Sequence, residues 1–298
     1  MLRNLIRKLI RLMFEIGMLK QTWYYGIRKR IILPWNLVAG KEVTDQFGGI
    51  IMKLNLDDWI QQQIYFLGIY EAEKTETHFW ENVVKDNDVI FDIGANIGYY
   101  AILASPIVGK SGLIYCFEPS NAIFHRMVEN FDLNKVRNTQ NIKMGLSNEV
   151  TKSTFYLGNK ENWGMGSLTP NDASSGETEI INVMSLDKFV LANNLYKIDV
   201  IKIDVEGSEF KILQGAMSTL SIYQPVVLIE VSNVLLKTND ASADDIYTSF
   251  QSIGFDAYEI VSDISLRKLQ THKEGNLIVF MHPSKIEGLK KQGLIFLA

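Results

Sequence analysis

Between residues 88 and 282 the chain alternates short apolar runs with longer amphipathic runs, and this rhythm limits its possible folds. Short runs rich in Val, Ile and Phe are typical of buried strands, and amphipathic runs of ten or more residues are typical of helices. Strands joined through helices predict a largely parallel sheet with helices on its faces. The expected strands are 88–93, 112–119, 140–146, 179–186, 198–205, 225–231, 255–261 and 275–282. The expected helices between them are 98–105, 121–134, 185–194, 206–220 and 242–254.

A single α/β domain is the simplest arrangement for most of the chain. No repeat, proline-rich linker or low-complexity block divides it, and 298 residues with 47% hydrophobic content can bury one large core. We therefore expect a Rossmann-like domain at residues 46–298, preceded by a basic amphipathic arm at residues 1–45. A polar, glycine-rich stretch at 148–180 interrupts the rhythm.

The arm differs sharply in charge from the rest. Residues 1–40 contain eight Lys or Arg and one acid, a net charge of +7, so the remainder carries −11 of the total of −4. Charges interrupt every apolar stretch, which argues against a membrane span and against a secretory signal. Helical spacing places the apolar residues on one face and four basic residues on another. The apolar set is Leu2, Leu5, Ile6, Leu9, Leu12, Met13 and Ile16, and the basic set is Arg3, Arg7, Lys8 and Arg11.

Two interpretations of this arm stay open. In the first, residues 1–30 form an interfacial helix on anionic lipid, extended by Trp23 and by the basic cluster at 28–30. In the second, the helix packs on the domain and turns its basic face to water. The first implies peripheral contact with the inner face of a membrane.

Composition narrows the classes of function. The only cysteine is Cys116, so no intrachain disulfide can form, which suits a reducing, cytoplasmic location. The four histidines are scattered, so we expect no metal site. The acidic body and the lack of a binding motif argue against a nucleic-acid partner.

A glycine-rich segment follows the first expected strand. After Asp92 come Gly94, Ala95, Asn96 and Gly98, which let the backbone approach a ligand closely. Ligands of open α/β sheets bind outside the carboxyl ends of strands. Asn96 stands where dinucleotide-binding loops have their second glycine, which weakens the case for a pyrophosphate.

Glu118 ends the next expected strand. A carboxylate there can accept hydrogen bonds from both hydroxyls of a ribose, so the two segments together predict a nucleoside-bearing ligand. The alternative is an ordinary glycine turn beside a solvated strand end.

Three segments resemble the FkbM family of S-adenosylmethionine-dependent methyltransferases. They are VIFDIGANIGYYAILAS, GLIYCFEPSNAIFHRMVENFDLN and IDVIKIDVEGSEFKILQGA, in the order and spacing of that family. The resemblance runs from about Gly68 to Val231 and leaves the first 45 residues outside. It implies a class I methyltransferase fold, with a mostly parallel seven-stranded sheet whose last strand is antiparallel.

The resemblance also implies roles for individual residues. Asp92 and the glycine segment would surround the methionine part of S-adenosylmethionine, Glu118 its ribose, and Gly145 with Leu146 its adenine. Independently of the resemblance, we assign Asp204, at the end of the expected strand 198–205, to the rim facing the methyl group. The expected cofactor-binding residues are Tyr70, Glu71, Asp92, Gly94, Ala95, Asn96, Gly98, Glu118, Gly145, Leu146 and Asp204.

The segment KIDVEGSE offers acids for the chemistry. A neutral alcohol is a poor nucleophile, and a nearby carboxylate helps by taking its proton. We expect Asp204 and Glu206 to be catalytic, with Glu206 orienting or deprotonating the acceptor. Glu209 is expected to be only a first-turn acid stabilised by the helix dipole.

The stretch at 159–168 resembles an Asn- and Gly-containing segment of the family. Asn162, Trp163 and Ser167 are expected either to form a lid over a polyol pocket or to lie in a plain mobile loop.

These features predict an O-methyltransferase that acts on a hydroxyl of a sugar, glycan or glycolipid. The runner-up acceptor is a polyketide-type small molecule. An NAD- or nucleotide-sugar-binding oxidoreductase of the same topology, or a non-catalytic module that keeps the cofactor site, are alternatives of other classes.

Overall fold

The computed structural model describes residues 2–18 and 21–297, which form two compact units. Unit 1 comprises the chain up to Lys74 together with Lys160–Trp163, and unit 2 comprises Thr75–Asn159 and Gly164–Ala298. The expected division after residue 45 differs from this grouping, because it falls inside the strand Glu42–Phe47, and unit 1 continues to Lys74.

Unit 1 is built around a hairpin and a buried helix. In the hairpin, β1 and β2 pair antiparallel from Glu42↔Asn55 to Phe47↔Ile50. Gly48 and Gly49, both with positive φ, form its two-residue turn, a conformation that glycine adopts without strain. The elements of unit 1 are α1 (Leu2–Glu15), α2 (Gln21–Ile27), the π-helix η1 (Arg28–Ile32), β1 (Glu42–Phe47), β2 (Ile50–Asn55), α3 (Trp59–Leu67) and the 3₁₀ helix η2 (Glu71–Glu73).

Helix α1 packs within unit 1 through its basic face. Arg7 and Arg11 both pair with Asp45 of β1, at 2.5 and 2.8 Å. Ile10 is buried beside them. The interpretation in which the basic face points to water is therefore wrong for these two arginines. The side chain of Leu2 lies outside the described part.

The main sheet of unit 2 has nine strands in the order β14-β12-β11-β13-β10-β9-β3-β4-β5. Its strands are β3 (Val89–Ile93), β4 (Leu113–Phe117), β5 (Thr139–Ile142), β9 (Val200–Ile203), β10 (Val226–Val231), β11 (Asp256–Ser262), β12 (Ser265–Lys268), β13 (Gly275–Met281) and β14 (Ile295–Leu297). From β5 to β10 all neighbours are parallel, and β13 pairs antiparallel with both β10 and β11. The expected antiparallel strand at 275–282 is thus confirmed. The count of seven is wrong, because β12 and β14 extend the edge beyond β11.

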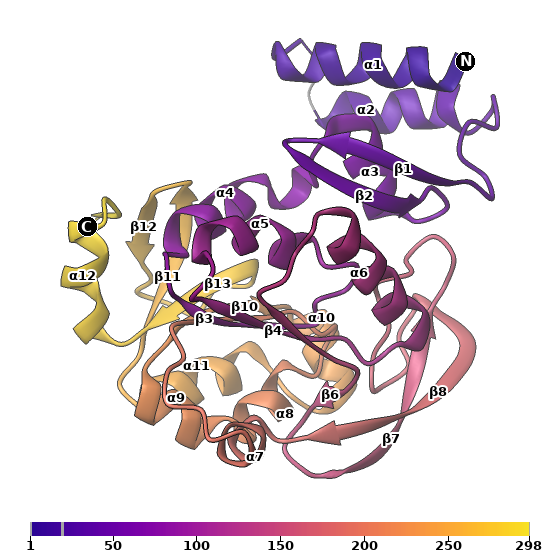
Figure 1. Cartoon of the computed structure of the whole chain (residues 1–298). Helices are drawn as coiled ribbons and strands as arrows, with labels where there is room; N and C mark the ends of the chain where they lie inside the picture. The colour runs from indigo at the N-terminus through magenta and orange to yellow at the C-terminus, as the bar shows by residue number, and fades with distance from the viewer. Residues whose placement is uncertain (1, 19–20, 298) are drawn as a thin grey trace. The chain divides into compact units, whose positions relative to one another are not determined.

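Helices cover both faces of this sheet. Figure 1 shows α4, α5 and α6 on one face, and α7, α8, α9 and α11 on the other. The helices are α4 (Lys74–Val83), α5 (Tyr99–Val108), α6 (Asn121–Leu133), α7 (Leu186–Ala192), α8 (Glu209–Gln214), α9 (Met217–Tyr223), α10 (Asn233–Leu236), η3 (Lys237–Asn239), α11 (Ala243–Ser252), η4 (Pro283–Lys285) and α12 (Ile286–Lys291). The single helix expected at 206–220 is divided into α8 and α9. Gly215 lies at the break, where a Cβ would be 2.3 Å from the Ser147 carbonyl oxygen.

A second sheet in unit 2 is formed by β6 (Gly145–Leu146), β8 (Ser174–Met184) and β7 (Thr151–Gly158), in that order. The expected strand 140–146 is therefore two strands, β5 in the main sheet and β6 in the small one. The expected strand at 179–186 is the end of the long β8, which pairs with β7 and β6 rather than with the main sheet.

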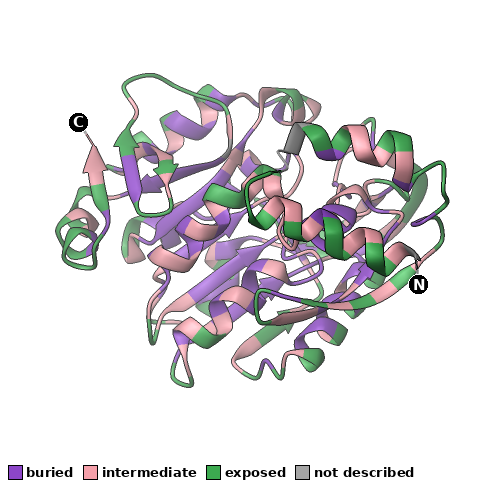
Figure 2. Ribbon diagram, turned by 90° about the horizontal axis from the view of Figure 1, so that it is seen from above, coloured by how far each residue is buried: buried purple, intermediate pink, exposed green. Residues whose placement is uncertain are grey.

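The core of unit 2 lies on both faces of its central strands. Ile201, Ile203, Phe91 and Val227 are fully buried, as Figure 2 illustrates with purple central strands. A parallel strand covered on both faces must be apolar throughout, which explains the continuous apolar runs of the sequence. Lys202 breaks this pattern because it is buried inside β9.

Candidate functional site

The glycine segment joins β3 to α5 in a tight loop. Gly94, Asn96 and Gly98 all have positive φ, at 81°, 49° and 87°. A Cβ on Gly94 would lie 1.9 Å from the carbonyl oxygen of Asp204, so only glycine lets the loops after β3 and β9 come this close. Gly98 packs against Phe131 of α6, where a Cβ would be 2.6 Å from the ring.

Glu118 connects this loop to the end of β4. One carboxylate oxygen accepts a hydrogen bond from Asn96 N at 3.1 Å, and the other accepts one from Ser120 N at 2.9 Å. Burial raises the pKa of Glu118 to about 7, and the two backbone N–H groups oppose that rise. Each carboxylate oxygen has two lone pairs, so both can still accept a ligand hydroxyl.

Asp92 and Lys202 face each other across neighbouring strands of the sheet. They are register partners on β3 and β9. Both carboxylate oxygens of Asp92 are buried and have no hydrogen-bond partner among the described residues. Burial raises the pKa of Asp92 to about 6, against the attraction of Lys202. A buried carboxylate without a donor is costly, which points to a ligand that completes it.

Asp204 follows β9 directly and pairs with Lys202 at 2.8 Å. The Lys202 ammonium also lies 4.6 Å from the ring centre of Tyr100 on α5. This buried lysine therefore compensates Asp204, whose side chain is about a quarter exposed, at 27%. Asp204 is the more accessible member of the pair.

The chain then turns sharply through Glu206 and Gly207. Glu206 has φ of 56°, a left-handed conformation that is unusual for glutamate. A Cβ on Gly207 would lie 2.7 Å from the Leu235 carbonyl oxygen. Such strain persists only where the surroundings hold it, and it gathers at functional sites.

Glu209 holds this turn from inside. Its Oε1 accepts hydrogen bonds from Val205 N and Gly207 N, both at 3.2 Å, and the side chain is buried. Burial raises its pKa to about 7. The expectation of a surface acid that serves only the helix dipole is therefore wrong, because Glu209 bonds the turn that carries Glu206.

The segment after Gly164 contacts both loops of the site. Ser167 is buried and its Oγ donates to the Glu206 carbonyl oxygen at 2.9 Å. A Cβ on Gly164 would lie 2.2 Å from Asn96 Nδ2. Ser167 thus lies at the site, while Asn162 and Trp163 belong to unit 1, where Trp163 N donates to Asp58.

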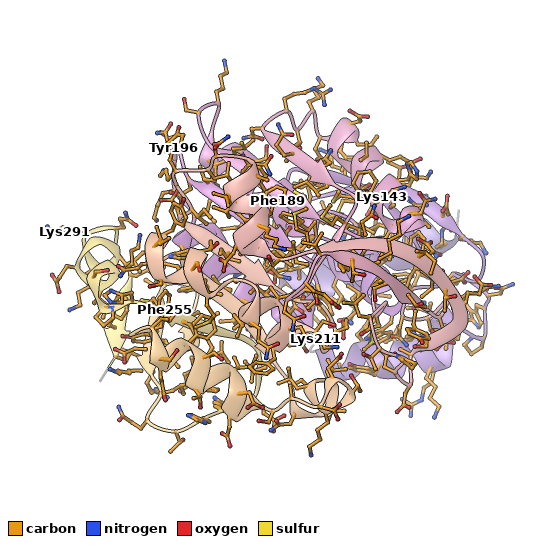
Figure 3. The ribbon with its side chains drawn as sticks, turned by 90° about the horizontal axis from the view of Figure 1, so that it is seen from below. Lys143, Phe189, Tyr196, Lys211, Phe255 and Lys291 are labelled. Carbon is orange, nitrogen blue, oxygen red and sulfur yellow. The ribbon has the colours of Figure 1, made fainter. Side chains whose placement is uncertain are left out.

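Asn239 also holds the turn, and sequence reasoning missed it. Its Nδ2 donates to the Gly207 carbonyl oxygen at 3.0 Å. Its Oδ1 accepts from Thr169 Oγ1 at 2.7 Å and from Lys211 Nζ at 2.8 Å; Figure 3 labels Lys211 on α8. No pattern in the sequence marks an asparagine that far along the chain.

The other expected cofactor-binding residues belong to further elements of the chain. Gly145 and Leu146 form β6 and are buried. Tyr70 and Glu71 belong to unit 1. Near the end of β4, a pocket of about 470 Å³ opens on unit 2, and Lys143, labelled in Figure 3, lies on it. Its lining residues are Pro119, Asn121, Lys143, Glu179, Ile180, Ile181 and Asn182.

Residues 2–18 and 21–297 contain neither a cluster of metal ligands nor a membrane-spanning helix. No group of three or more His, Cys, Asp or Glu side chains there is placed to hold a metal ion. Within the same ranges, no helix has both the length and the apolar character needed to cross a membrane.

A match to a known protein family shows the family of this chain. The model of the methyltransferase FkbM domain matches residues 92–257, more than half of the chain. The chain belongs to the FkbM methyltransferase family. This FkbM domain is an S-adenosylmethionine-dependent methyltransferase domain, as the sequence motifs predict.

Individual relatives of the FkbM domain are distant. The hexuronic acid methyltransferase AglP of Haloferax volcanii is 27% identical over 144 residues, covering 48% of this chain and 56% of AglP. Methyltransferase 1 of Beauveria bassiana is 27% identical over 148 residues, covering 44% of this chain and 59% of that protein. The matches thus span little more than half the length of either relative. The crystal structure of an FkbM methyltransferase from Methylobacillus flagellatus KT matches with a TM-score of 0.42 and 16% identity, covering 76% of this chain and 55% of that one.

The residues at the carboxyl ends of β3, β4 and β9 suit the cofactor of this family. Glu118 offers acceptors for ribose hydroxyls, and the unpartnered oxygens of Asp92 offer acceptors for the amino group of a methionine moiety. Gly94 and Gly98 let the loop lie close against Asp204 and Phe131. Carboxylates also favour the positive charge of a sulfonium, since opposite charges attract strongly in a poorly solvated site.

Proposed function

We propose that this protein transfers a methyl group from S-adenosylmethionine to a hydroxyl of a sugar, glycan or glycolipid. The observation that carries the proposal is the strained turn after β9. There Asp204 and Glu206 follow the strand that neighbours the glycine loop, and Glu209, Ser167 and Asn239 hold the backbone in place.

In the proposed mechanism the turn positions the acceptor and takes its proton. When bound, S-adenosylmethionine supplies an electrophilic methyl group on a positively charged sulfur. The turn would hold the acceptor oxygen toward that methyl group, and the sulfur would leave as a neutral thioether. Glu206 orients the hydroxyl and receives the proton, and Asp204, paired with Lys202, lines the cofactor side. Holding the reactants in line contributes much of the acceleration.

One relative supports a sugar as the acceptor, and one chemical argument supports a hydroxyl as the group that is methylated. AglP is named a hexuronic acid methyltransferase. Hydroxyl acceptors need a base, and the turn carries two carboxylates within three residues of each other. A polyketide-type acceptor uses the same hydroxyl chemistry and remains the second candidate. The roles of Tyr70, Glu71, Gly145 and Leu146 at the cofactor also remain proposals, as do a cytoplasmic location and the absence of a nucleic-acid partner.

Methyl-labelled S-adenosylmethionine and a panel of acceptors test the proposal. The panel contains uronic acids, neutral hexoses and hydroxylated polyketides, each analysed by mass spectrometry for an added methyl group. We expect label on a sugar hydroxyl. Label on the polyketides alone would assign the runner-up acceptor. If calorimetry shows that S-adenosylhomocysteine binds and no acceptor is ever methylated, the module is non-catalytic.

A further inference from the structure

The outer face of α1 is apolar and exposed, the reverse of an ordinary amphipathic helix on a protein surface. Arg7 and Arg11 face inward, and Arg11 also donates to the Tyr65 carbonyl oxygen. The ring of Tyr65 lies under the Arg7 guanidinium, 5.2 Å from its centroid. Because these contacts use the basic side of the helix, its opposite side must point away from unit 1.

That opposite side carries four large apolar residues at helical spacing. They occupy positions i, i+4, i+7 and i+11 of the helix and are each more than half exposed; they are Leu5, Leu9, Leu12 and Ile16. Figure 2 shows exposed segments, in green, along the helix that begins at the N-terminus. Each exposed apolar side chain has an unfavourable free energy of contact with water. A partner surface that covers all four would therefore bind to this face of α1.

Exposed apolar residues concentrate in the same part of the chain. Of the nineteen large hydrophobic residues that are exposed in the described part of the chain, nine lie between residues 5 and 35. Trp23 and Trp35 are among them, and each is more than half exposed. Tryptophan is favoured at the boundary between lipid headgroups and acyl chains. Exposed apolar residues occur singly on the surface of any protein, but here they are concentrated in one short segment.

Positive charge accompanies this apolar surface. Lys8 on α1 and Lys29 with Arg30 on η1 are exposed, and residues 1–40 carry a net charge of +7. In a twofold dimer the same face would meet itself and bring two such charges together, which is unfavourable. An anionic lipid surface both covers apolar side chains and neutralises basic ones.

We infer that unit 1 docks on an anionic phospholipid membrane. The exposed residues Leu5, Leu9, Leu12 and Ile16 enter the boundary of the acyl chains, and Lys8, Lys29 and Arg30 contact the headgroups. The inward contacts of Arg7 and Arg11 with Asp45 keep the apolar face turned outward. Unit 1 would then hold the enzyme at a lipid surface, independently of which acceptor the methyltransferase site uses.

Vesicle sedimentation with the full chain tests this inference. We expect the protein to sediment with vesicles of equal parts phosphatidylcholine and phosphatidylglycerol. Binding should be much weaker to pure phosphatidylcholine, and should fall when salt is raised from about 0.1 to 0.5 M, because salt screens charge. The double substitution Leu9→Gln with Leu12→Gln should lower partitioning roughly tenfold or more, from the transfer free energy of two leucines.

A matched control keeps the test specific. Leu191 and Ile222 of unit 2 are more than two thirds exposed, so Leu191→Gln with Ile222→Gln removes comparable exposed apolar surface elsewhere. This control should sediment like the wild type, and all variants should bind S-adenosylhomocysteine equally. The inference is overturned if the wild type ignores anionic vesicles, or if both double variants lose binding alike. A wild-type dimer in solution that becomes monomeric in the Leu9/Leu12 variant would assign the face to a second copy instead.

Discussion

At the scale of single residues, Glu118 has two roles, one in holding the loop after β3 and one in binding the ligand. Its carboxylate accepts from Asn96 N and Ser120 N, and in our proposal it also accepts from the cofactor ribose. Glu118→Ala should weaken S-adenosylhomocysteine binding roughly ten- to a hundredfold, since a hydrogen bond to a charged group contributes about 1.5–3 kcal/mol. Calorimetry measures the affinity, and the exposed Glu177→Gln is the control. Tighter binding of NAD than of S-adenosylhomocysteine would contradict the assigned ligand.

Glu206 is the residue on which the proposed chemistry depends. Glu206→Gln keeps the size of the side chain but cannot take a proton, so turnover should fall by about 10²–10⁴-fold while cofactor affinity is retained. Single-turnover methyl transfer at saturating cofactor measures the loss. Asp204→Asn should differ, because Asp204 pairs with Lys202 beside the cofactor loop, and both affinity and rate should change. Full activity in a folded Glu206→Gln would move the base elsewhere.

At the scale of elements, the connection from β9 to α8 depends on Glu209. Glu209→Ala removes the acceptor of Val205 N and Gly207 N. Leaving buried N–H groups unpaired costs about 1–3 kcal/mol of unfolding free energy, and releases the strained turn at Glu206. We expect a lower midpoint in urea and a lower kcat.

The isosteric Glu209→Gln is the informative companion to that variant. Its amide oxygen can still accept both N–H groups, so it should retain most of the activity. If Glu209→Ala were as stable and active as the wild type, the turn would be held by Ser167 and Asn239 without it.

At the scale of the whole molecule, three buried carboxyl groups make stability depend on pH. Burial raises the pKa of Asp92 from 3.8 to about 6, and those of Glu118 and Glu209 from 4.5 to about 7. A raised pKa in the folded state means that folding favours the protonated carboxyl group. The resulting stabilisation of the folded protein is fully present below the pKa of the unfolded state, and it is lost as pH rises through the pKa of the folded state. The free energy of unfolding of the cofactor-free protein should therefore decrease from about pH 4 to pH 7 through these groups.

Ion pairs on the surface have the opposite effect on the pH dependence of stability. Lys273, for example, lowers the pKa of Glu259, so this pair stabilises the folded protein more as pH rises. Comparison of the wild type with Glu209→Gln isolates one buried group. Urea unfolding should give similar stabilities near pH 4 and a growing advantage for the variant toward pH 8, on the order of a few kcal/mol. An equal difference at every pH would show that Glu209 does not titrate in this range.

The central strands, the glycine loop and the acids at the strand ends could be predicted from the sequence. These depend on local properties: apolar runs for strands buried on both faces, glycine where φ is positive, and an acid next to a strand end. Asp92, Glu118 and Asp204 were therefore predictable as neighbours, because parallel strands bring their carboxyl ends to one edge.

Features that depend on packing between distant segments could not be predicted from the sequence. The addition of β12 and β14 to the sheet, the burial of Glu209 and the bonds of Asn239 to the turn all come from such contacts. For α1, the sequence predicts two faces but not which one turns inward. That choice is made by Asp45 on β1, whose carboxylate pairs with two arginines and leaves the leucines outside. A helical pattern shows that two faces differ, and it takes the partner surface to decide which of them is buried.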